Sequence, residues 1–287
     1  MNAVLVVARL TVSEAWRKRL LLTVAGLSLV FVGLYLYGVH LLVDALRSRA
    51  IDPMDPASVG QQGFSSLEFL AMYVVNFLGG LMGALAAVGT IASEVDSGLM
   101  QAIVPKPITR ASLVFGKWLG YEVLTSVYLW LLAGSMIAGT TLISGYTPPS
   151  PLPALALMNL NALLLLTLTV LGSCLLSTLA NGIVVVLLYG MAWAGGLLQA
   201  IGELTRTHLL SNLGQASVFL LPSDALWRGA SYYLQPEWLL EVERQAPVRI
   251  NPFAGMDPPA AWLIVYAAAF LLAALLGAVA AFNRRDL

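Results

Sequence analysis

Six long apolar stretches decide what this chain can fold into. They cover residues 20–43, 67–92, 118–143, 154–179, 183–202 and 260–282. A helix of about 20 apolar residues crosses the roughly 30 Å hydrocarbon core of a bilayer, and it satisfies its own backbone hydrogen bonds there. The composition agrees, because 59% of the 287 residues are hydrophobic and 10% are charged. The sequence therefore predicts an all-α integral membrane protein, a single domain over residues 1–287 with six transmembrane helices.

Residues 2–19 predict an N-terminal amphipathic helix that lies in the membrane interface. At 100° per residue one side of this helix is apolar; it carries Val4, Leu5, Ala8, Val12, Ala15 and Trp16. The apolar stretch that follows is too long for the core of a signal peptide. We therefore expect residues 20–43 to be retained as the first span.

The placement of basic residues predicts the orientation of the spans. Lys plus Arg and Asp plus Glu number 15 each, so the net charge itself indicates no partner. With the N-terminus inside, nine Lys and Arg fall on inner segments and six on outer segments, and all three Lys are inside. Basic residues favour the cytoplasmic side. Both termini are therefore expected to be cytoplasmic.

The segment over residues 93–117 is the main polar interruption on the predicted inner side. It starts with Glu94 and Asp96, continues with an apolar run at 99–104, and turns back through a Pro-Lys-Pro break. Carboxylates are favourable at a helix N-terminus, and an apolar helix face can enter a groove on a partner. The pattern favours a short helix that meets a soluble partner over an ordinary solvated loop.

The segment over residues 203–259 is the long outer loop, and it contains no Lys. Pro222-Ser223-Asp224 and Pro236 are typical helix starts, and the residues that follow them are rich in aromatic side chains. Short helices at the outer membrane surface are therefore expected before the last span. Simple surface packing is one interpretation; an outer gate, or a dock for an extracytoplasmic protein, is the other, and its residues would be Pro222, Asp224, Trp227 and Arg228.

Motifs for catalysis are missing from the sequence. Gly116-Lys117 is followed by Trp118, and residue 111 is Ala, so there is no phosphate-binding P-loop. The two histidines are distant from each other and Cys174 is the single cysteine, which excludes the usual metal-ligand spacings. The sequence predicts no catalytic residue, no metal site and no cofactor bound by this chain.

Polar groups within the spans are few. Glu68 and Glu122 lie near predicted span ends, where they can pair or reach the interface. Amide side chains can bond across helices, and this group contains Asn76, Asn159, Asn161 and Gln199. Gly79 and Gly83 have the spacing of a close-packing motif, for which general close packing of helices is favoured over a specific dimer seam.

The inner segment carries a family likeness. Its acidic start is followed by Gly98, an apolar run, Pro107, Arg110 and then Gly116-Lys117. With the N-terminal helix, the six spans and residues 222–228 before the last span, the chain resembles the type-2 ABC exporter permease family. Within that family it is most similar to the permeases of the transporters that serve nitrous oxide reductase maturation. The likeness covers nearly the whole chain and is most specific at the inner segment.

The resemblance implies a cytoplasmic coupling helix between spans two and three that sits in a cleft of a separate ATP-binding subunit. The residues it assigns to this contact are Glu94, Asp96, Gly98, Leu99, Met100, Ile103, Val104, Pro107, Arg110 and Lys117.

It further implies two copies of an ABC-type nucleotide-binding subunit, which carry the ATP and Mg, and a second permease that completes a homodimer or heterodimer. The chain itself would be a non-catalytic exporter subunit in the bacterial cytoplasmic (inner) membrane, in contact with lipid and with no nucleic acid.

Two other functions are compatible with a six-span chain. One is a membrane anchor or assembly subunit for an extracytoplasmic partner, without transport of its own. The other is a membrane-embedded enzyme that acts on lipid, which needs clustered nucleophiles or metal ligands that the sequence does not contain.

Overall fold

The computed structural model describes residues 3–17, 19–49, 59–96, 109–246 and 251–284. These residues form helices and connecting turns, with no β-strand among them. The helices are α1 (Ala3–Arg17), α2 (Arg19–Ser48), α3 (Val59–Ala87), α4 (Ala92–Asp96), α6 (Arg110–Ser144), α7 (Pro151–Leu175), α8 (Thr178–Thr205), α9 (His208–Leu220), α10 (Ser223–Leu234), α11 (Glu237–Gln245) and α12 (Ala261–Arg284). The predicted all-α fold is confirmed.

Six of these helices are long and apolar enough to cross a membrane. They are α2, α3 with the short α4, α6, α7, α8 and α12. Their order agrees with the six predicted spans, but α3 begins at Val59, eight residues before the expected start, and α6 begins at Arg110 instead of 118. The short turn between the fourth and fifth spans was expected at residues 180–182. It lies at Leu176 and Ser177, so Asn181 is inside α8.

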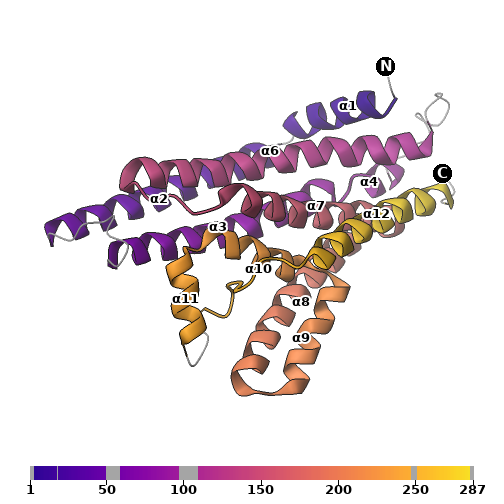
Figure 1. Ribbon diagram of the computed structural model, residues 1–287. Coiled ribbons are helices and arrows are strands. Elements are labelled where there is room, and N and C mark those ends of the chain that lie inside the picture. Colours follow the sequence, from indigo (N-terminus) through magenta and orange to yellow (C-terminus); the bar gives the residue numbers. More distant parts are fainter. Residues whose placement is uncertain (1–2, 18, 50–58, 97–108, 247–250, 285–287) are drawn as a thin grey trace.

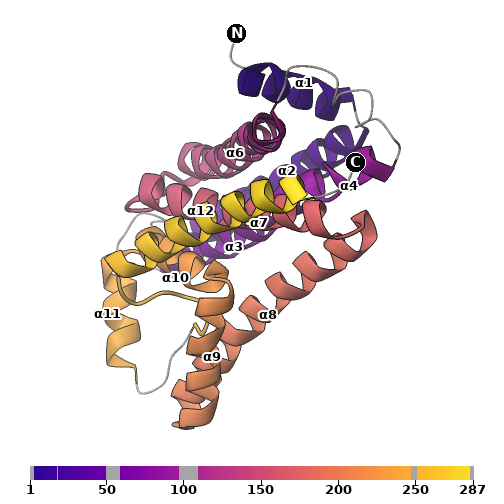
Figure 2. The same cartoon turned by 90° about the vertical axis from the view of Figure 1, so that its right-hand side faces the viewer.

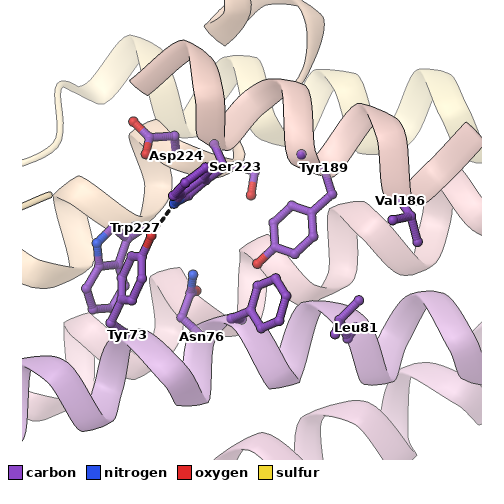
Figure 3. A pocket seen from close by; sticks show the side chains of 11 residues that line it. Tyr73, Asn76, Leu81, Val186, Tyr189, Ser223, Asp224 and Trp227 are labelled. Carbon is purple, nitrogen blue, oxygen red and sulfur yellow. Dashed lines mark hydrogen bonds between the residues drawn. The ribbon is translucent and has the colours of Figure 1, made fainter. Parts of the chain in front are cut away.

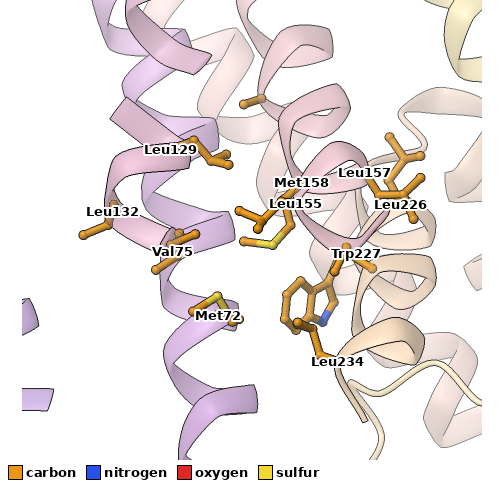
Figure 4. Packing of buried hydrophobic residues seen from close by; sticks show 14 of the residues in the cluster. Met72, Val75, Leu129, Leu132, Leu155, Leu157, Met158, Leu226, Trp227 and Leu234 are labelled. Atoms are coloured by element: carbon orange, nitrogen blue, oxygen red, sulfur yellow. The ribbon is translucent and has the colours of Figure 1, made fainter. Parts of the chain in front are cut away.

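The core lies where α3, α6, α7 and α10 meet (Figure 4). Its fully buried side chains include Met72, Leu129, Met158, Leu164 and Trp227. Since lipid tails are as apolar as these side chains, close van der Waals packing stabilises this contact more than exclusion of water does.

Two glycines of α3 make that packing close. A Cβ at Gly79 would lie 2.7 Å from Cδ1 of Leu129, and one at Gly83 would lie 2.9 Å from the carbonyl oxygen of Ala162. The glycine spacing therefore serves contacts of α3 with α6 and α7 inside the chain.

The N-terminal helix α1 packs along the first turns of α6 (Figure 1). A Cβ at Gly116 would lie 2.5 Å from Cβ of Val7, and one at Gly120 would lie 2.8 Å from the carbonyl oxygen of Ala8. The helix is amphipathic as predicted, but part of its apolar side faces α6, while Leu5 is exposed.

Helices α8 and α9 form an antiparallel hairpin that diverges from the other spans (Figure 2). Their backbones touch. A Cβ at Gly202 would lie 2.4 Å from the backbone nitrogen of Ser211, and one at Gly214 would lie 2.6 Å from the carbonyl oxygen of Gly195. Helix α9 was not expected from the sequence, whereas the starts of α10 and α11 agree with the predicted starts at Pro222 and Pro236.

A buried polar cluster joins α2, α3 and α6. Glu68 is 1% exposed, and the Tyr35 hydroxyl donates to its Oε2 at 3.3 Å. The same hydroxyl lies 2.8 Å from Oγ1 of Thr140. Because α3 begins at Val59, Glu68 lies nine residues after the start of the helix instead of at its beginning. Just outside the spans, burial raises the pKa of Tyr146 to about 12, so this phenol stays neutral.

Candidate functional site

The inner end of the bundle is organised by a buried ion pair. The Nζ of Lys117 in α6 lies 2.5 Å from Oε1 of Glu94 in α4, and the two side chains are 8% and 15% exposed. The same Nζ donates to the carbonyl oxygen of Thr90 at 2.6 Å. Because separating buried charges costs several kcal/mol, this pair fixes the start of the inner segment to α6.

The far end of the inner segment is fixed to the last span. Thr109 caps α6, since its hydroxyl accepts from the backbone N–H of Ser112 at 3.1 Å. One guanidinium nitrogen of Arg110 donates to the carbonyl oxygens of Phe282 and Asn283 at 3.0 and 3.1 Å. The guanidinium also lies over the Phe282 ring, 5.7 Å from its centre. A cation is favourable at the C-terminal end of a helix, so Arg110 joins the first turn of α6 to the last turn of α12.

A third tie holds the turn between α3 and α4. The Asn181 amide in α8 donates to the carbonyl oxygen of Val88 at 2.8 Å and to that of Thr169 at 3.0 Å. Sequence reasoning missed this residue because it placed Asn181 in a turn. An amide in an otherwise apolar helix was the signal that could have identified it.

Some of the predicted coupling residues make the contacts described above, and the others lie outside the residues that the structure describes. Glu94, Arg110 and Lys117 have the contacts given above, and the backbone of Asp96 ends α4. The other predicted contacts lie outside the described residues; they are Gly98, Leu99, Met100, Ile103, Val104 and Pro107. In this structure Lys117 faces α4, so its role here is within the chain.

The four outer residues lie within the protein instead of forming an exposed patch. Pro222 and Trp227 are buried, and the indole N–H of Trp227 donates to the carbonyl oxygen of Phe253 at 3.0 Å. Arg228 donates through Nε to Oδ2 of Asp224 at 2.7 Å, and through a second nitrogen to the carbonyl oxygen of Gly196 at 2.7 Å. The bond from Arg228 to Gly196 attaches α10 to α8.

A cavity of about 500 Å³ lies between α3 and α8, below the first turn of α10 (Figure 3). Its lining residues are Tyr73, Asn76, Phe77, Leu81, Val186, Tyr189, Gly190, Trp193, Ser223, Asp224 and Trp227. The indole N–H of Trp193 in α8 donates to the hydroxyl of Tyr73 in α3. Two of the predicted outer residues, Asp224 and Trp227, thus form part of a cavity wall.

Interhelical bonding is seen between two of the four amide residues named from the sequence. The amide nitrogen of Asn161 in α7 donates to Oδ1 of Asn76 in α3 at 3.1 Å. The amide of Gln199 donates along its own helix to Glu203. Within the described ranges there is no group of three or more His, Cys, Asp and Glu side chains that could hold a metal ion.

Comparison with known proteins identifies the family of the chain. Curated proteins give no significant match. The model of the ABC-2 family transporter proteins matches residues 5–287, which includes all six spans and both sets of contacts described above. The chain therefore belongs to the ABC-2 family and is a multi-pass permease subunit of an ABC transporter.

Proposed function

We propose that this chain converts ATP hydrolysis on a separate subunit into export of a compound across the membrane. The observation that carries the proposal is that both ends of the inner segment are tied to spans. Lys117 holds Glu94, and Arg110 holds the end of α12. A displacement of residues 97–108 by a partner would thus be transmitted to α6 and α12, and through the α3–α4 turn to Asn181 in α8.

The assembly we propose contains two permeases and two ATP-binding subunits, with ATP and Mg on the latter. The ten coupling residues named from the sequence, from Glu94 to Lys117, remain the proposed contact region. Helix α8 supports a contact with lipid or with a second permease, since Val184, Leu187 and Met191 are exposed on it. We place the complex in the cytoplasmic membrane of a bacterium, with both termini inside.

The outer helices have a place in the same proposal. Because Arg228 connects α10 to Gly196 in α8, a movement of α8 would change the contacts of Trp227 and Pro222 in and beside α10. This is the arrangement expected of an outer gate, and an extracytoplasmic protein remains a proposed further partner.

The test is deletion of residues 99–104 from the complex with its ATP-binding subunit. We expect the deletion to abolish the stimulation of ATPase activity by the permease, and to abolish transport, while the spans remain folded. A control deletes residues 247–250 on the outer side and keeps Asn251, whose backbone N–H donates to Glu243. If stimulation and transport survive the inner deletion, the coupling proposal is wrong, and the anchor function takes its place.

A further inference from the structure

Aromatic side chains form a large part of the lining of the cavity between α3 and α8. Five aromatic rings surround it, from Tyr73, Phe77, Tyr189, Trp193 and Trp227. Phe77 and Tyr189 are stacked, with ring centres 5.7 Å apart and planes 15° apart. Tyr73 and Trp227 meet edge to face at 5.1 Å. Such a set of faces and edges favours a ligand that itself carries a ring.

The charges beside the cavity already neutralise each other. Asp224 is paired with Arg228 at 2.7 Å, and Arg228 is held further by the carbonyl oxygen of Gly196. An ion that entered would lose its water without gaining a free opposite charge, which costs several kcal/mol. The cavity is therefore suited to an uncharged ligand.

Few polar groups are available to orient such a ligand. The Asn76 amide oxygen already accepts from Asn161. The hydroxyl of Ser223 points toward the cavity (Figure 3). The Asn76 amide nitrogen and the hydroxyls of Tyr73 and Tyr189 also belong to lining residues. The lining thus offers a ring-bearing compound extensive apolar contact and a few hydrogen-bonding groups, a pattern typical of small-molecule sites.

The mouth of the cavity opens at membrane depth. Phe77, Val186 and Trp193 line it and are 49%, 48% and 47% exposed. Phe77 lies near the middle of α3 and Val186 in the first half of α8, both within spans. A ligand would therefore reach the cavity from the hydrocarbon phase, after it has partitioned into the bilayer.

Gly190 leaves part of the cavity free. A Cβ at this position would have no atom within 4 Å, so a larger side chain would occupy space that is otherwise open. By contrast, a Cβ at Gly80 of α3 would lie 2.7 Å from Cδ1 of Leu165. Gly190 is thus an exposed lining residue at which a larger side chain meets no clash at its Cβ atom.

We infer that this cavity is a binding site for an uncharged, ring-bearing apolar compound that enters from the bilayer. Its volume of about 500 Å³ falls within the usual range of small-molecule sites. Identification of the ligand with the transported compound rests on the function proposed above, whereas binding itself needs no partner subunit.

The experiment uses the full chain in lipid nanodiscs and two probes with the same rings. N-phenyl-1-naphthylamine is uncharged, and 8-anilinonaphthalene-1-sulfonate carries a sulfonate. Energy transfer from tryptophan to each probe is measured after subtraction of the signal from empty nanodiscs. We expect saturable binding of the uncharged probe and binding of the sulfonate that is weaker by at least about tenfold.

Two variants of the same type locate the site. Gly190→Leu should weaken binding of the uncharged probe by at least about tenfold. Gly134→Leu, at a position in α6 where a Cβ also has no atom within 4 Å, should leave it unchanged. Trp193→Leu should also weaken binding of the uncharged probe. It replaces Gly190→Leu if a thermal unfolding measurement shows that Gly190→Leu is not folded.

Two results would overturn the inference. They are equal binding of both probes, and unchanged binding of the uncharged probe in folded Gly190→Leu and Trp193→Leu. Deletion of residues 99–104 should leave probe binding intact, so a failure of coupling and a failure of binding are distinguishable.

Discussion

The Nζ of Lys117 lies 2.5 Å from Oε1 of Glu94, across the boundary between α6 and the short helix that opens the inner segment. The two residues are 23 positions apart in the chain and enclose all of the segment proposed to contact the ATP-binding subunit. The pair therefore fixes the distance between the two ends of that segment.

Removal of one partner of this pair should destabilise the protein more than removal of both. Glu94→Gln or Lys117→Met leaves a buried group without its counter-charge, and we expect a loss of about 3 kcal/mol in the free energy of unfolding. The double variant should recover much of it. Thermal unfolding in detergent measures the stability, and stimulation of the partner ATPase should stay low in all three variants. Full stimulation in the double variant would show that the pair has no role in coupling.

Asn181 should stabilise the α3–α4 turn. Asn181→Ala removes hydrogen bonds to the carbonyl oxygens of Val88 and Thr169 and should cost about 1–2 kcal/mol. Gly172→Ala should have a similar effect, because its Cβ would lie 2.0 Å from Oδ1 of Asn181. The control is Gly277→Ala, whose Cβ would lie 3.5 Å from Leu171. Equal melting temperatures of the two glycine variants would contradict this role.

Tyr35 should be more important for stability than Tyr37, although both lie in α2. Tyr35→Phe removes the hydroxyl that donates to Glu68, whose other carboxylate oxygen has no hydrogen-bond partner among the described residues. A loss of about 1–2 kcal/mol is expected. Tyr37 is exposed, so Tyr37→Phe should leave the melting temperature in nanodiscs unchanged. A matching shift in both variants would mean that the buried hydroxyl does not stabilise the outer half of the bundle.

The proposed orientation predicts which cysteines react from outside the cell. Val242 in α11 and Ser13 in α1 are both exposed, while the natural Cys174 is buried and is replaced by Ser in the background. A membrane-impermeant maleimide should label Val242→Cys in intact cells, and Ser13→Cys after the membrane is opened. Labelling of Ser13→Cys in intact cells would reverse the topology.

The spans could be predicted because residues that face lipid have to be apolar. The first and last residues of each helix were harder to predict. Residues 59–66 contain Gln61, Ser65 and two glycines, a composition typical of a loop, yet they form the first turns of α3. There Ser65 and Phe64 are buried against other helices. Tertiary contacts therefore decide the start of this helix, and hydropathy cannot reveal them.

The candidate sites could likewise be predicted only in part: their local sequence features could be recognised, but the distant residues that they contact could not. The inner segment was identified by its charges and prolines, which are local features. The partners of those charges are not local, since Arg110 contacts Phe282 and Asn283 more than 170 positions away. The aromatic cavity depends on α3, α8 and α10 together, and no single stretch of the sequence contains its pattern.

The glycine contacts between α8 and α9 have a mechanical consequence. Where two helix backbones touch at Gly202 and Gly214, no flexible side chain separates them, so the hairpin resists shear between its two helices. Both helices of the hairpin are also anchored, α8 by the bond from Arg228 to the Gly196 carbonyl oxygen and α9 by the bond from the Tyr266 hydroxyl to the Phe219 carbonyl oxygen. A load on α10 or α12 would therefore be shared by α8 and α9 as one unit.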